Sequence, residues 1–162
     1  MIKLNNLKIG NSERLTIFGG VNVIESKELI FEVAEEFIKN SSKFKFNFVF
    51  KASFDKANRS SLDSYRGPGL EDGLKILSEL KQKYNLPILT DIHEPHQAKP
   101  VSEVCDIIQI PAFLCRQTDL VVEAAKTGKI INLKKPQFMS AKEIFHVVKK
   151  CESVGNKNII LC

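Results

Sequence analysis

Short apolar runs alternate with longer amphipathic stretches along the whole chain of 162 residues. The runs have the length and composition of buried strands, and the stretches between them repeat apolar residues at spacings of three and four, as helices do. Strict alternation of strand and helix predicts parallel strands joined by right-handed crossovers, which is an α/β fold. The expected strands are 15–18, 46–51, 87–91, 107–110, 129–134 and 158–162.

Five helices are expected between these strands, and capping residues indicate several of their ends. The fifth should open with a capping box in which Ser140 and Glu143 each satisfy the other's backbone N–H. A small hairpin is expected before the first strand, with turns at Asn5-Asn6 and Gly10-Asn11. The expected limits are a first helix after Ser26, a second over 69–84, a third over 96–105, a fourth with Thr118 as N-cap ending before Gly128, and a fifth ending near Gly155.

Composition and charge indicate one soluble domain over 1–162, because 43% of the residues are hydrophobic, 27% are charged, and no linker divides the chain. No apolar stretch is long enough to cross a bilayer, and the N-terminus lacks a signal-peptide core, so we expect a cytoplasmic protein without a membrane partner. The net charge of +5 favours anionic partners, but no basic run indicates nucleic acid. We expect the cysteines to be buried and reduced: Cys105, Cys115, Cys151 and Cys162.

Polar residues stand at the carboxyl ends of several predicted strands. Lys51 and Lys134 end two of them, Gln109 lies within a third, and Asp91 with His93 closes a fourth. Carboxyl ends of parallel strands are where both open and barrel α/β folds place their ligand sites. The alternative for either lysine alone is a strand end that emerges into solvent.

The segment 52–68 is an unusually long connection for a compact domain, and such loops tend to be functional. Its cations are Lys56, Arg59 and Arg66, with Asn58, Ser60 and Ser61 as neutral hydrogen-bonding groups. Guanidinium and ammonium groups recognise phosphate, so the loop suits a sugar phosphate or another small phosphorylated ligand. The alternative is a solvated basic loop.

Two further motifs are weak. His93 and His96 have the spacing of half a zinc site, but Pro95 is incompatible with the mid-helix geometry of such sites, and we expect no metal. Gly19-Gly20 is not a dinucleotide fingerprint, so no cofactor is expected. His146 lies within the fifth predicted helix and reads as structural or exposed.

Several segments closely resemble the 3-deoxy-D-manno-octulosonate 8-phosphate synthase family, and the resemblance runs over essentially the whole chain. It implies a (β/α)8 barrel, of which this chain holds about six strands and five helices, and an enzyme that condenses phosphoenolpyruvate with D-arabinose 5-phosphate for lipopolysaccharide biosynthesis. The most specific segments are K-A-N-R-S-S over 56–61 and R-Q-T-D-L over 116–120; the others are 18–26, 50–55, 65–70, 90–94, 108–113 and 126–138.

The resemblance also implies roles for individual residues. Asn22 stands where one branch of the family has a metal-binding cysteine, so the chain resembles the metal-independent branch, and the family suggests a homotetramer. The implied phosphoenolpyruvate site is Lys51, Ser53, Lys56, Gln109, Pro111, Ala112 and Lys134; the implied arabinose 5-phosphate site is Asn58, Arg59 and Ser60; and the implied catalytic residues are Lys134, Asn22, Asp91 and His93, with Arg116 at the site wall or a subunit contact.

The length of 162 residues is well short of the roughly 250 typical of such barrels. We expect an incomplete piece of an active synthase. The alternatives are an inactive remnant, and a phosphate-binding or assembly module completed by another chain. The alternative chemistry is a related phosphoenolpyruvate-dependent aldol synthase that uses erythrose 4-phosphate.

Overall fold

The computed structural model describes all residues, Met1–Cys162. They form two compact units, Met1–Thr90 and Asp91–Cys162. A single domain over 1–162 stays a prediction.

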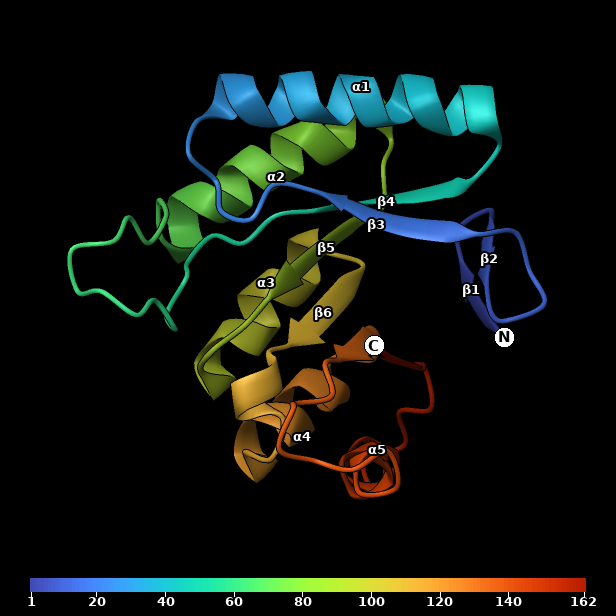
Figure 1. Cartoon of the computed structure of the whole chain (residues 1–162), viewed down its shortest axis with the longest axis vertical. Coiled ribbons are helices and arrows are strands. Elements are labelled where there is room, and N and C mark those ends of the chain that lie inside the picture. Colours follow the sequence, from blue (N-terminus) through green and yellow to red (C-terminus); the bar gives the residue numbers. More distant parts are fainter. The chain divides into compact units, whose positions relative to one another are not determined.

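The first unit opens with an antiparallel hairpin and continues with three parallel strands in the order β3, β4, β5 (Figure 1). The predicted hairpin is confirmed, with Asn5 at φ 50 in its turn. Its elements are β1 (Ile2–Leu4), β2 (Leu7–Ile9), β3 (Thr16–Gly20), α1 (Lys27–Phe44), β4 (Asn47–Lys51), α2 (Leu70–Tyr84) and β5 (Ile88–Asp91), whose last residue opens the second unit.

Helix α1 begins where the sequence predicts, because the Ser26 hydroxyl accepts a hydrogen bond from Leu29 N at 3.1 Å. Figure 1 shows α1 lying along β3 and β4. Its Phe37 ring stacks on Phe48 of β4 with centroids 4.9 Å apart. Gly19 of β3 permits this contact, since a Cβ there would lie 2.5 Å from the Phe37 ring. The aromatic face of β4 thus packs under α1.

The second unit holds three parallel strands in the order β6, β7, β8. Helices α4 and α5 pack against each other, and their buried residues include Val121, Ala124 and Val147. The elements are a 3-10 turn η1 (Pro95–Gln97), α3 (Ala98–Val104), β6 (Ile107–Ile110), a 3-10 turn η2 (Ala112–Leu114), α4 (Thr118–Lys126), β7 (Ile130–Leu133), α5 (Ile144–Glu152) and β8 (Ile159–Leu161).

The predicted fold class is confirmed, because six parallel strands alternate with five α-helices after a hairpin. These are the βα repeats from which a (β/α)8 barrel is built. None of the helices combines the length and the apolar character needed to cross a membrane.

Three helix starts differ from the prediction. The N-cap of α4 is Gln117, and Thr118 is already helical, with no side-chain cap bond. The Ser140–Glu143 box forms, with Ser140 N to Glu143 Oε2 at 2.8 Å and Glu143 N to Ser140 Oγ at 3.3 Å, but it closes a turn and α5 begins at Ile144. The helix expected over 96–105 divides into η1 and α3 because Pro95 starts a tighter turn.

Candidate active site

In the first unit, the backbone that leaves β4 is held from several sides. The Lys51 carbonyl accepts a hydrogen bond from Val21 N at 3.1 Å, and the Ser53 carbonyl accepts one from Ile24 N at 3.0 Å. The Thr90 hydroxyl donates to the carbonyl of Ala52 at 2.7 Å. Ser53 is fully buried, whereas Lys51 is half-buried. This end of β4 is therefore a rigid base from which the Lys51 side chain projects.

Gly20 allows β3 to approach this base closely. Its φ of +151 lies in the region that favours glycine, and a Cβ there would lie 2.1 Å from the Lys51 carbonyl oxygen. Asn22 follows Gly20 by two residues in the sequence, and it is exposed. The Gly19-Gly20 pair thus serves close backbone and ring packing.

The loop after β4 is closed at its base by hydrogen bonds from Lys56 N to Arg66 O at 2.7 Å and from Gly69 N to Phe54 O at 3.0 Å. Arg66 also donates from Nε and Nη2 to the two carboxylate oxygens of Asp55, at 2.8 and 2.5 Å. Arg66 is therefore engaged within the loop itself, and phosphate binding by the three cations of the loop stays a prediction. A bidentate partner within the loop uses its guanidinium fork.

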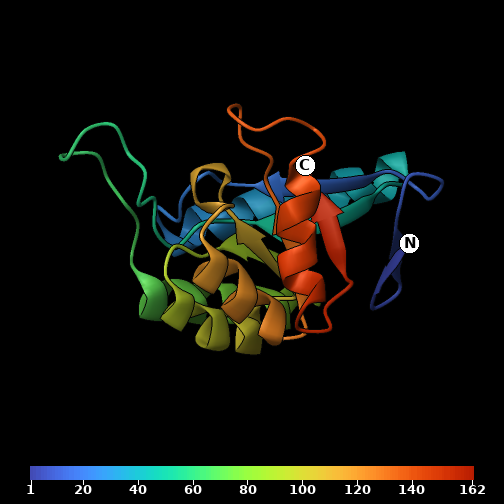
Figure 2. The ribbon, with the colours of Figure 1, turned by 90° about the horizontal axis from the view of Figure 1, so that it is seen from below.

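The tip of this loop presents Asn58, Arg59 and Ser60, all exposed. The Arg59 guanidinium donates one hydrogen bond within the loop, from Nε to Tyr65 O at 3.3 Å. Tyr65 is held in turn, because its Oη donates to Ile24 O at 3.1 Å. In Figure 2 the loop, coloured teal to green, projects from the strands of its own unit. The terminal nitrogens of Arg59 can therefore meet an anion.

In the second unit, Asp91 and His93 form a close pair, with His93 Nε2 3.2 Å from Asp91 Oδ2. Both side chains are at least nine-tenths buried. The backbone N–H groups of His93 and Glu94 both donate to Gln97 Oε1, at 2.7 and 3.2 Å, which fixes the turn that follows β5. A carboxylate that holds an imidazole in this way suits proton transfer or the orientation of a water.

His96 lies exposed in η1, whereas the side chains of Asp91 and His93 are buried. No group of three or more His, Cys, Asp or Glu side chains is arranged to hold a metal ion. The absence of a metal remains a prediction for this protein.

Gln109 and Asn132 are register partners on the neighbouring strands β6 and β7, and Asn132 Nδ2 donates to Gln109 Oε1 at 3.0 Å. Both amides are buried, at 6% and 2% exposure. The Gln109 carbonyl also accepts a hydrogen bond from Ile92 N at 3.2 Å, which ties this strand to the Asp91–His93 turn. Asn132 is not among the predicted site residues, although strand alternation places it on the same face as Lys134.

Lys134 follows β7, and its side chain is exposed, while its backbone N–H donates to Ile110 O at 3.2 Å. Pro111 and Ala112 come next along β6 and start η2, where Leu114 N donates to Pro111 O at 3.0 Å. The structure therefore brings Lys134 to the backbone that leads into Pro111. Gln109, Pro111 and Lys134 all lie at the carboxyl ends of β6 and β7.

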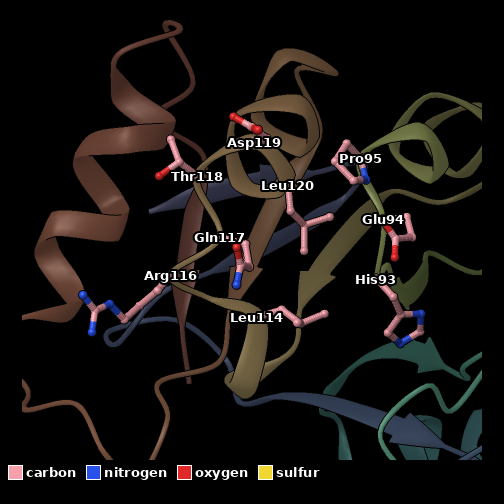
Figure 3. A pocket seen from close by; sticks show the side chains of 9 residues that line it. All are labelled: His93, Glu94, Pro95, Leu114, Arg116, Gln117, Thr118, Asp119 and Leu120. Carbon is pink, nitrogen blue, oxygen red and sulfur yellow. The ribbon is translucent and has the colours of Figure 1, made fainter.

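A cleft of about 530 Å³ lies beside this region in the second unit. Figure 3 shows His93 and Glu94 on one side of it and Arg116 on the other, with the Arg116 side chain directed away from them. The Arg116 carbonyl accepts a hydrogen bond from Lys150 Nζ at 2.8 Å. The cleft is lined by His93, Glu94, Pro95, Leu114, Arg116, Gln117, Thr118, Asp119 and Leu120.

Three of the cysteines are buried, as predicted, but Cys162 is exposed. Cys162 follows β8, a strand that is itself only partly covered. Burial raises the pKa of the Cys115 thiol and raises that of Cys151 to about 11. Thiols held in the protonated form are poor nucleophiles and metal ligands, so Cys115 and Cys151 serve packing. His146 is exposed, as expected.

Together these features define an α/β protein of barrel-type βα repeats, with lysine and amide side chains at the carboxyl ends of its strands. The chain matches the family model described as DAHP synthetase I family over residues 1–162. It belongs to that family.

Curated relatives agree with this assignment. The chain is 56% identical over 162 residues to the 2-dehydro-3-deoxyphosphooctonate aldolase of Pseudoalteromonas translucida (strain TAC 125), with 100% of this chain and 57% of that protein covered. The protein of the same name in Pseudomonas putida (strain GB-1) is 56% identical, with 100% of this chain and 58% of that protein covered. The chain thus spans 57–58% of the length of these relatives.

Proposed function

We propose that the protein condenses phosphoenolpyruvate with D-arabinose 5-phosphate to give 3-deoxy-D-manno-octulosonate 8-phosphate and inorganic phosphate. The observation that carries the proposal is the set of anion-binding groups at the strand ends of a chain 56% identical to a protein named 2-dehydro-3-deoxyphosphooctonate aldolase. Lys51 is the last residue of β4, whose end is held by backbone hydrogen bonds, and Lys134 follows β7, which carries one member of the buried amide pair. Two phosphorylated substrates require at least two such cationic groups.

Phosphoenolpyruvate carries a carboxylate and a phosphate, and its proposed ligands supply both charge and directed donors. Ammonium groups act as point charges toward phosphate, and an amide N–H orients a carboxylate or phosphate oxygen. Pro111 and Ala112, which follow β6, are proposed to pack against the three-carbon substrate. The proposed ligands are Lys51, Ser53, Lys56, Gln109, Pro111, Ala112 and Lys134.

Arabinose 5-phosphate is proposed to bind at the tip of the long loop. Arg59 offers its terminal guanidinium nitrogens to the phosphate, because only its Nε is hydrogen-bonded to Tyr65 O. Asn58 and Ser60 flank it and are exposed, so their side chains can bond the phosphate or the sugar hydroxyls. Arg66 takes no part, since it is paired with Asp55.

In the proposed reaction, C3 of phosphoenolpyruvate attacks C1 of the aldehyde, and a C–C bond forms. The aldehyde oxygen takes a proton, for which Lys134 is the proposed donor, and becomes a hydroxyl. Water adds at C2 and loses one proton, which leaves a hydroxyl on C2. As the C2–O bond to phosphate breaks, this hydroxyl gives its proton to the departing phosphate, which leaves a ketone and inorganic phosphate. Asp91 and His93 are proposed to orient this water and move its proton, because their side chains already form a close buried pair.

Asn22 is proposed to orient a water or a substrate oxygen, and the reaction is proposed to need no metal. A neutral amide supplies no thiolate for a divalent ion. The protein is further proposed to act in the cytoplasm, without nucleic acid or membrane partners, and as a homotetramer.

Phosphate release tests the proposal. The purified protein is mixed with phosphoenolpyruvate and either arabinose 5-phosphate or erythrose 4-phosphate, with and without a chelator. We expect release with arabinose 5-phosphate that the chelator leaves unchanged. Release with erythrose 4-phosphate alone would assign the alternative acceptor, loss with chelator would contradict metal independence, and no release with either sugar would overturn the proposal.

Variants identify the residues in the same assay. Arg59→Ala and Lys134→Ala should each lower kcat/KM by about a hundredfold or more, since each removes a charged contact to substrate or a proton donor. His146→Ala is the matched control, because His146 is exposed and belongs to none of the proposed subsites. Equal activity of all three variants would contradict the assigned roles.

A further inference from the structure

The buried amide pair of Gln109 and Asn132 is asymmetric. Asn132 Nδ2 is the donor and Gln109 Oε1 the acceptor, at 3.0 Å. The two residues are register partners in parallel strands, so their side chains leave the same face of the sheet. The bond occupies the oxygen of Gln109 and leaves both hydrogens of its Nε2 outside the pair.

The side-chain oxygen of Asn132, in contrast to its nitrogen, makes no hydrogen bond. Its Oδ1 is buried and has no hydrogen-bond partner. On the other side of β7 its register partner is Ile160, whose side chain has no donor to offer. The hydrogen bond that Asn132 donates to Gln109 is therefore the one hydrogen bond of its side chain.

Packing alone does not account for such a pair. A buried amide acceptor without a partner is destabilising, and two leucines in the same register would leave no polar group unsatisfied. Asn156, another buried asparagine of this unit, shows the contrast, because its side chain makes three hydrogen bonds to Ala125 O, Lys129 O and Asn158 N. The Gln109–Asn132 pair is therefore less fully hydrogen-bonded than a purely structural amide such as Asn156.

We infer that Asn132 is a positioning residue that holds the Gln109 amide with its Nε2 donors directed at an anionic oxygen of phosphoenolpyruvate. The inference rests on the proposed function. Without Asn132, the Gln109 amide can turn over and present its oxygen, which repels a carboxylate or phosphate. The donated bond also polarises the Gln109 amide, and this strengthens its N–H groups as donors.

A double-mutant cycle tests this role, with KM for phosphoenolpyruvate and phosphate release as readouts. Gln109→Ala should raise this KM by about tenfold to a hundredfold, as expected for the loss of a hydrogen bond to a charged group, with a smaller change in kcat. Asn132→Ala should raise it by a similar factor, and the double variant should equal Gln109→Ala alone. A residue that acts only on folding would instead add its effect to that of Gln109→Ala.

Asn132→Asp tests the direction of the bond. A carboxylate at this position can only accept, so Gln109 must turn its NH2 toward it and away from the substrate. We expect the KM for phosphoenolpyruvate to rise further than in Asn132→Ala. Asn156→Ala, assayed well below its unfolding midpoint, is the matched control and should leave this KM within about twofold of the wild type.

The outcomes separate this inference from the proposed function. If the wild-type protein neither binds phosphoenolpyruvate nor releases phosphate, both fall. If the wild type is active but the two single effects multiply in the double variant, or if Asn132→Asp binds phosphoenolpyruvate like the wild type, the positioning role alone is overturned.

Discussion

Asn156→Ala is expected to destabilise the second unit strongly. The Asn156 side chain joins three segments, since Nδ2 donates to Ala125 O at the end of α4 and to Lys129 O before β7, both at 2.9 Å. Its Oδ1 accepts a hydrogen bond from Asn158 N, at 2.9 Å, just before β8. The residue is 6% exposed, so water cannot easily replace these partners.

The magnitude follows from these three bonds. At about 1 kcal/mol each, their loss lowers the free energy of unfolding by about 3 kcal/mol, with more expected if the carbonyl of Ala125 stays dry. In a chain of this size, each 1 kcal/mol moves the midpoint of thermal unfolding by about 2–4 °C, so the midpoint should fall by about 6–12 °C. Circular dichroism at 222 nm measures the midpoint, and urea unfolding gives the free energy.

Asn158→Ala is the control, because Asn158 is exposed and only its backbone takes part in the bonds around Asn156 and Ile131. It should stay within about 0.5 kcal/mol of the wild type. An Asn156→Ala variant that differs from Asn158→Ala by less than 1 kcal/mol would refute the reasoning.

Three further predictions concern packing, thiol reactivity and pH. Gly19→Ala should cost about 1–3 kcal/mol in urea unfolding, because its Cβ would lie 2.5 Å from the Phe37 ring; an unchanged midpoint would contradict this. In a thiol-labelling experiment at about pH 8, the exposed Cys162 should react before the buried Cys151. Burial raises the pKa of Cys151 to about 11, so only about a thousandth of the Cys151 thiol is ionised at that pH. Fast labelling of Cys151 would contradict its burial. Hydrogen bonds from Ser140 hold the pKa of Glu143 below its ordinary 4.5. The difference in free energy of unfolding between the wild type and Glu143→Ala should therefore be complete above about pH 4.5 and disappear as the pH falls through the lowered pKa. A difference that persists in acid would contradict the capping box.

Much of the fold follows from local sequence patterns. The runs around Val49, Ile108 and Ile131 are strands because they are buried on both faces, and their ends agree with the prediction to within two residues. The first residues of helices are harder to predict from the sequence, because neighbouring residues decide whether a capping side chain starts a helix or closes a turn. The Ser140–Glu143 box, for example, forms as predicted yet closes a turn ahead of α5.

Polar residues at or near the carboxyl ends of strands, such as Lys51 and Gln109, could be located from the sequence. Sequence alone could not show that Arg66 is engaged by Asp55, because that pair depends on how the loop closes. It also could not show that Asn132 donates to Gln109, since strand register decides which residues face each other. The roles taken from the family resemblance stay proposals, because neither contacts nor burial tests them.

The fate of the bridging oxygen of phosphoenolpyruvate tests the central claim most directly. Phosphoenolpyruvate labelled with 18O at the C2–O–P bridge is incubated with the protein and arabinose 5-phosphate, and the products are analysed by mass spectrometry. Condensation with cleavage of the C2–O bond predicts labelled phosphate together with an eight-carbon sugar acid phosphate. Label retained in pyruvate, or substrate recovered unchanged, would contradict the account.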